Sequence, residues 1–125
     1  MFARVTCLAV LLTVFLLGCA HRVETFKFEN RTDMLISADI YGFEDNLPVG
    51  EIYPSLKGGN IANMHPMRLP EQVMIAWNEN PDKNTSGFHN MDNLSLTSLT
   101  NWSRDATLVF EFESNRVWRA FYEQR

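Results

Sequence analysis

Hydrophobic and polar side chains alternate along most of the chain after residue 22, while the 3.6-residue period of an amphipathic helix is almost absent. A period of two residues is typical of strands that bury one face. Residues 88–99 are the exception, because they fit either a strand followed by a turn or a single helical turn. The other alternating segments predict strands over residues 23–29, 34–41, 49–53, 61–65, 73–77, 106–113 and 117–122.

Turn-forming residues separate these segments at intervals of about ten residues. Seven or eight short antiparallel strands with this spacing predict an all-β fold, a single small β-sandwich of immunoglobulin-like type. The inward positions of the clearest strands should form its core, and they are Ile36, Ile40, Ile75, Trp77, Leu108, Phe110 and Phe112.

The first residues follow a different pattern. Arg4 precedes a stretch over residues 5–17 that is apolar apart from Thr6 and Thr13. A short apolar core after a basic start is typical of a secretory signal, and it is too short to span a bilayer comfortably. We therefore predict a signal peptide over residues 1–18, a tether over 19–22 and the β-sandwich domain over 23–125.

The end of this signal, Leu16-Leu17-Gly18-Cys19, resembles the lipobox of bacterial lipoproteins. In that family the cysteine thiol is acylated and the cysteine becomes the mature N-terminus. The resemblance implies that Cys19 carries lipid and anchors the domain. Ala20 follows the cysteine, where an aspartate would favour the inner membrane, so we expect the periplasmic face of the outer membrane.

Composition restricts the chemistry of the mature chain. Its other cysteine, Cys7, leaves with the signal, which excludes disulfides, thiolate catalysis and cysteine metal sites. After Cys19 the chain has ten basic and fifteen acidic residues, a formal charge of −5, and no basic run. This balance argues against nucleic acid and against electrostatic binding to anionic lipid, so the membrane contact should come from the acyl chains.

Residues 82–87 begin like a calcium loop, with oxygen-bearing side chains at alternate positions and a final glycine. The twelfth position of such a loop would be Asn93, where an EF-hand needs a bidentate glutamate, so a hairpin loop is the better interpretation. The histidines lack metal-ligand spacing, and the chain lacks a nucleophile elbow and a phosphate-binding loop. We expect no enzyme activity, no metal and no cofactor.

Candidate binding residues lie in two places. On the last predicted strand Val117, Arg119 and Phe121 oppose Trp118, Ala120 and Tyr122, so one face should fill the core and the other should leave large side chains at the surface. The candidates on this strand are Trp118, Arg119 and Tyr122. Tyrosine, tryptophan and arginine are enriched at protein interfaces. The alternative is that residues 88–104 cover this strand. The second candidate is the loop over residues 78–87, which offers Asp82 and Asn84.

The signal, Cys19 and the segment Leu69-Pro70-x-x-Val73-x-Ile75-x-Trp77 together resemble small uncharacterised lipoproteins of Gram-negative bacteria. These are similar to periplasmic immunity lipoproteins of type VI secretion effectors. The resemblance implies a protein that binds and inhibits a secreted toxin, and Cys19 is the only functional residue that it carries over. The alternative is an accessory lipoprotein that scaffolds a secretion system or a pilus.

The lipobox generates the first testable prediction. The wild-type protein should incorporate a fatty-acid probe and remain in the membrane fraction, because several acyl chains on one cysteine give stable anchoring. A Cys19→Ser variant should lose both properties. Labelling or membrane retention of that variant would contradict the assignment.

Overall fold

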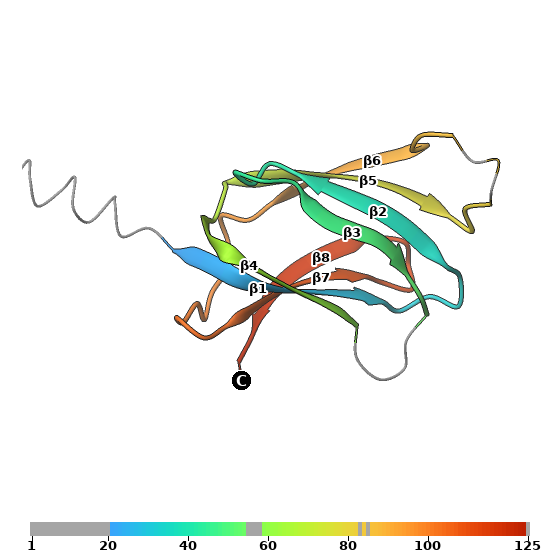
Figure 1. Cartoon of the computed structure of the whole chain (residues 1–125). Helices are drawn as coiled ribbons and strands as arrows, with labels where there is room; N and C mark the ends of the chain where they lie inside the picture. Colours follow the sequence, from blue (N-terminus) through green and yellow to red (C-terminus); the bar gives the residue numbers. More distant parts are fainter. Residues whose placement is uncertain (1–20, 55–58, 83, 85, 125) are drawn as a thin grey trace, which may run out of the picture.

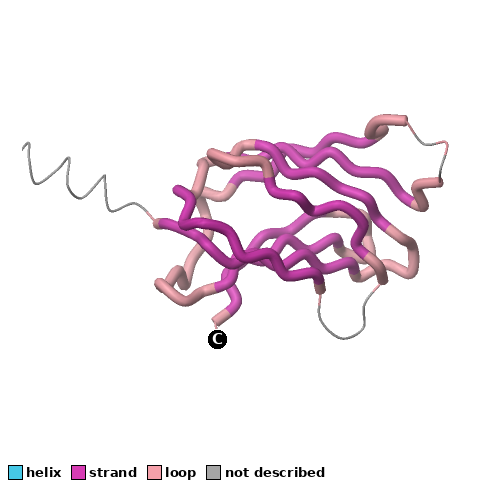
Figure 2. Tube along the Cα trace, viewed as in Figure 1, coloured by secondary structure: helices cyan, strands magenta, loops and turns pink. Residues whose placement is uncertain are grey.

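The computed structural model describes residues 21–54, 59–82, 84 and 86–124, so the predicted signal peptide and Cys19 lie outside the described residues. The described part of the chain consists of strands and their connections and contains no helix (Figure 2). The eight strands are β1 (Arg22–Asn30), β2 (Ile36–Tyr41), β3 (Leu47–Ile52), β4 (Asn60–Arg68), β5 (Gln72–Glu79), β6 (Asn90–Ser95), β7 (Thr107–Phe112) and β8 (Trp118–Glu123). The all-β prediction is confirmed, and the ambiguous segment over 88–99 contains strand β6.

The strands form two packed four-stranded sheets, which confirms the predicted β-sandwich (Figure 1). Sheet A has the order β4-β1-β7-β8, and sheet B has the order β3-β2-β5-β6. In the constant-type immunoglobulin sandwich the first two strands pair within one sheet, whereas here β1 and β2 lie in different sheets. The sandwich is therefore shared with that fold, and the strand order differs.

One pair of strands is parallel, in contrast to the antiparallel pairing that was predicted throughout. Strands β1 and β7 run in the same direction, with Phe26 opposite Leu108 and Phe28 opposite Phe110. Parallel neighbours need a long crossover connection, and here the chain passes through both sheets between β1 and β7. Hairpin signals in the sequence cannot reveal such a pairing, because the partners lie about 80 residues apart.

The strand directions place the connections at two ends of the sandwich. The end at which β1 starts also holds the β2–β3, β4–β5 and β6–β7 connections, where the Leu69 amide donates to the His21 carbonyl at 3.0 Å. The opposite end, here called the distal end, holds the β1–β2, β3–β4, β5–β6 and β7–β8 connections (Figure 1). A hydrogen bond of 2.8 Å from the Asn80 amide to the Leu35 carbonyl joins two of the distal connections.

The core lies between the two sheets and has the composition that the alternation predicts. All seven predicted core residues are buried, and Ile36, Ile40 and Ile75 on sheet B oppose Leu108 and the phenylalanines of sheet A. Aromatic rings join the layers, because the Phe112 ring centroid lies 4.7 Å from that of Trp77 and 5.0 Å from that of Trp118. Such offset and tilted pairs add to the free energy gained by burial alone.

A buried asparagine fastens the end of β1 to sheet B. The Asn30 side-chain amide donates to the carbonyls of Met34 at 2.6 Å and Ile52 at 3.0 Å. Its side-chain oxygen accepts hydrogen bonds from the Thr32 amide and the Thr32 hydroxyl. These bonds satisfy a polar group that would otherwise be costly to bury, and they fix the turn that carries the chain from sheet A to sheet B.

Phe110 provides a test of the core. The side chain is fully buried and contacts the rings of Phe28 and Phe43, so Phe110→Ala should lower the free energy of unfolding by about 3–5 kcal/mol. Urea unfolding followed by circular dichroism measures this loss. Ile61→Ala is the matched control, because Ile61 is exposed and its truncation should change stability by no more than about 0.5 kcal/mol. Equal losses in the two variants would contradict the core assignment.

Candidate functional site

The predicted exposure of Trp118 and Tyr122 is wrong. Trp118 is 4% exposed and Tyr122 is 8% exposed, and both belong to the inner face of β8. The reason is the register between β7 and β8, which places Trp118 opposite Phe112 and Tyr122 opposite Leu108. Residues opposite one another in a sheet share a face, so both aromatic side chains point into the sandwich. The alternation along β8 could not decide this, because large side chains occupy both of its faces.

Arg119, the third predicted residue of this strand, is exposed and lies on the outer face of sheet A. Its guanidinium contacts the Glu111 carboxylate at 3.3 Å and the Glu113 carboxylate at 3.0 Å. It also covers the ring of Phe121 at 4.5 Å, a cation–π contact. Arg119 is therefore held by partners within the domain.

Glu111 is the centre of an ion-pair network on this outer face. The residue is 3% exposed, although it points away from the core, because Arg31 and Arg119 cover its carboxylate from two sides. The hydrogen bond from Arg31 to Glu111 raises the pKa of that guanidinium further above its usual range. The two arginines compensate a charge that would be costly to bury alone.

A second branch of the network surrounds Lys27 on β1. Its ammonium lies 3.0 Å from the Glu29 carboxylate and 3.2 Å from the Glu123 carboxylate. The hydrogen bond to Glu29 is the largest cause of a raised pKa at Lys27. Lys27, Arg31 and Arg119 are thus each paired with glutamates on the outer face of sheet A.

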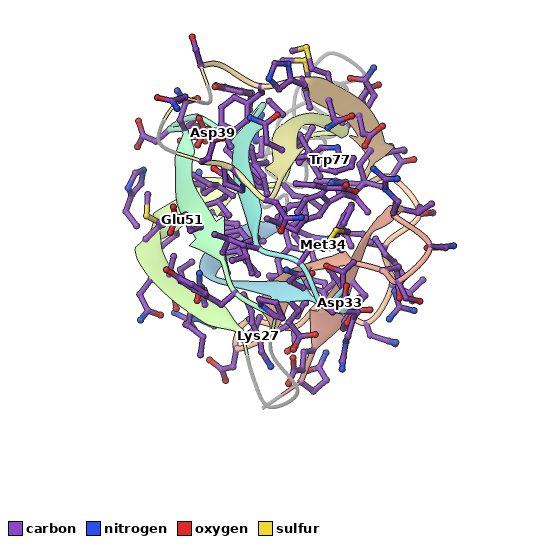
Figure 3. All side chains as sticks on the ribbon, turned by 90° about the vertical axis from the view of Figure 1, so that its right-hand side faces the viewer. Lys27, Asp33, Met34, Asp39, Glu51 and Trp77 are labelled. Carbon is purple, nitrogen blue, oxygen red and sulfur yellow. The ribbon has the colours of Figure 1, made fainter. Side chains whose placement is uncertain are left out.

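Sheet B is different, because its four strands contain no lysine or arginine and four acidic residues. Two of these acids have a structural role. Glu79 pairs with Arg116 at 2.5 Å, and Asp92 accepts a hydrogen bond of 2.7 Å from the Trp77 indole. The other two, Asp39 and Glu51, form no ion pair with a described residue. Figure 3 shows Asp39 on the opposite side of the sandwich from Lys27, and Glu51 at the edge formed by β3.

A tyrosine two residues further along the chain accompanies each of these two carboxylates. The Tyr41 hydroxyl donates to Asp39 at 3.3 Å, and the Tyr53 hydroxyl donates to Glu51 at 3.1 Å. The charge of Asp39 raises the pKa of Tyr41, and the hydrogen bond to Glu51 raises that of Tyr53. A phenol is neutral at physiological pH in any case, so both tyrosines donate hydrogen bonds to their neighbouring carboxylates there.

Exposed apolar surface lies next to these pairs. Met91 on β6 is 62% exposed and aligns, through Ala76 on β5, with Asp39 on β2. Tyr53 is exposed to the same extent. We name this outer surface of sheet B, formed by Asp39, Tyr41, Glu51, Tyr53 and Met91, the acidic face. Sequence reasoning missed it, because the alternation indicates which residues point outward but not which strands share a sheet.

The predicted loop residues lie at the distal end, in the connection between β5 and β6. Asp82 and Asn84 are both exposed, and the Asn84 amide donates to the Asp82 carboxylate at 2.9 Å. This is the local turn that aspartate commonly forms. Lys83 and Thr85 lie outside the described residues. Within the described ranges, no group of three histidine, cysteine or acidic side chains could hold a metal ion.

No family model, curated protein or solved structure matches the chain. The part of the chain that the structure describes also has no helix with the length and apolar character needed to cross a bilayer.

Tyr122 generates a prediction about pH. Burial raises the pKa of Tyr122 to about 12, against 10 for an ordinary tyrosine. The folded protein therefore keeps the phenolic proton where the unfolded chain begins to lose it. The contribution of the neutral Tyr122 phenol to the free energy of unfolding is complete below pH 10 and is lost as the pH rises through about 12.

Tyr122→Phe removes the ionising group. The difference in unfolding free energy between wild type and this variant should be constant from about pH 7 to 9 and should shift in favour of the variant above pH 10. Urea unfolding across this range measures it. Tyr53→Phe is the comparison: its hydrogen bond to Glu51 raises its pKa, but solvent screens this exposed pair, so its difference should shift less than that of Tyr122→Phe. A constant difference up to pH 12 would contradict the burial of this hydroxyl.

Proposed function

We propose that this protein is a lipid-anchored, periplasm-facing immunity protein that inhibits a secreted toxin by binding it, without catalytic turnover. The observation that carries the proposal is the unequal treatment of charge on the two outer faces. On sheet A, Lys27, Arg31 and Arg119 pair with glutamates of the same face, whereas the acidic face leaves Asp39 and Glu51 without an ion-pair partner among the described residues. A protein partner with a basic surface would supply the missing charges.

The composition of the acidic face also suits a protein partner. Tyr41 and Tyr53 are held by hydrogen bonds to their neighbouring carboxylates, so little side-chain entropy would be lost on binding. Met91 adds adaptable apolar surface beside them. Tyrosine and methionine are enriched at interfaces, and the fixed carboxylates would add electrostatic steering of a cationic partner.

The strand directions fit this proposal as well. An anchor at Cys19 would hold the starting end of β1 next to the membrane, because only residues 20–21 separate the two. The acidic face runs along the side of the sandwich, and the distal loops would point away from the bilayer (Figure 1). A partner in the periplasm could therefore reach both.

A toxicity rescue assay tests the function. The probes are the products of the genes beside this one, each produced in the periplasm of a host that also expresses the full chain, and the effector is the product that inhibits growth. We expect the wild-type chain to restore growth. Normal growth inhibition in the presence of correctly localised wild-type chain would favour the accessory-lipoprotein alternative instead.

Charge reversal tests the acidic face. The double variant Asp39→Lys, Glu51→Lys should lose protection, because it replaces the attraction of a basic partner with repulsion. The matched control is Glu24→Lys, Glu71→Lys, which makes the same change in net charge at exposed positions outside the face. Binding of the purified effector should fall by at least about tenfold in the first variant only. Equal behaviour of the two variants would contradict this binding surface.

A further inference from the structure

A groove of about 210 Å³ opens on the side of the sandwich where β6 faces the start of β8. Strand β6 contributes three consecutive residues to its wall, and the β7–β8 turn and the first residue of β8 provide the rest. The lining residues are Asp92, Asn93, Leu94, Arg116, Val117 and Trp118. Val117 is 53% exposed and forms an apolar part of the wall.

The indole of Trp118 has a buried N–H group without an acceptor among the described residues. The contrast with Trp77 is informative, because both indoles pack against Phe112 and the Trp77 N–H donates to Asp92. Buried donors almost always have a partner, and Trp118 lines the groove, so the unpaired N–H favours an acceptor from outside the domain. The indole nitrogen has almost no accessible surface, so binding of that acceptor requires a movement of the Trp118 side chain or of the groove wall.

The strand edges beside the groove are also unprotected. Strands β3 and β4, the edges on the other side of the sandwich, contain Pro48 and Pro66 and have an irregular register with their neighbours. Proline and bulges are the devices by which proteins prevent the addition of a further strand. Strands β6 and β8 contain no proline, and their registers are continuous. This side of the sandwich can therefore accept a strand from outside.

We infer that the groove binds an extended segment of a partner protein, which pairs with the free edge of β6 and inserts a primary amide side chain, glutamine or asparagine. The amide oxygen accepts the hydrogen bond from the Trp118 indole. The amide NH₂ donates to the carboxylate of Asp92, so the groove offers the donor and the acceptor that this group requires. Backbone pairing along β6 supplies affinity, and the groove supplies specificity.

This inference rests on the proposed function for the identity of the partner, which is the secreted toxin, but its chemistry can be tested separately. The probe is a blocked, extended hexapeptide with alternating valine and threonine and one central glutamine. The control peptide has leucine in place of the glutamine. The protein is the full chain, solubilised in detergent and labelled with ¹⁵N at its three tryptophan indoles.

We expect the glutamine peptide to shift the indole N–H resonance of Trp118 downfield, because the proton gains an acceptor, and to leave that of Trp102 unchanged. The leucine peptide should produce no such shift. Equal shifts with both peptides, or no shift with either, would overturn the inference. So would a Trp118 resonance that changes with protein concentration alongside dimerisation in sedimentation, since a second copy would then fill the groove.

The toxin complex provides the second measurement. Trp118→Phe removes the donor and keeps an aromatic ring, and it should weaken binding of the effector by about 3–10-fold, the value of one hydrogen bond. Should this variant fail to fold, the wild-type titration still decides the question. A peptide response without toxin binding would refute the proposed function alone, whereas toxin binding without a peptide response would refute the groove alone.

Discussion

The contact of Phe112 with two indoles holds the sandwich together. Phe112 on β7 lies between Trp77 of sheet B and Trp118 of β8, so one ring links both layers and the edge strand. The described residues contain no cysteine, and the domain therefore depends on such packing. This contact also determines which face of β8 is available. Because Trp118 is required inside, Arg119 is outside, and the neighbouring glutamates pair with it.

The charged side chains on the two outer faces have different kinds of partner. On sheet A, basic and acidic side chains from β1, β7 and β8 alternate across the strands and satisfy one another. On sheet B, Asp39 and Glu51 accept hydrogen bonds from tyrosine hydroxyls, which fix the geometry of these carboxylates without neutralising them. Uncompensated charge on one face lowers the stability of the isolated domain slightly, because the charges repel one another. A partner of opposite charge would remove this repulsion on binding.

Local alternation predicts most of the fold here, because seven of the eight strands lie in segments where apolar and polar residues alternate. Alternation does not predict which face of a strand is buried where that face depends on long-range strand pairing. Trp118 and Arg119 lie on opposite faces of β8, and only the register with β7 determines which of them is buried. The acidic face cannot be predicted from local alternation either, because Asp39 and Met91 become neighbours only when β2, β5 and β6 join one sheet. The lipidation of Cys19 is predicted from the arrangement of the signal peptide, and the alternation of the strands gives no information about it.

The parallel pairing of β1 and β7 has a mechanical consequence. Strand β1 is flanked by β4 on one side and β7 on the other, and its first residue is the point at which the preceding chain joins the domain. A pull along that chain while the distal end is held loads both hydrogen-bond ladders of β1 in shear. The bonds run across the strand and must therefore break together rather than one after another. The domain is built to resist tension along the direction in which it would be tethered.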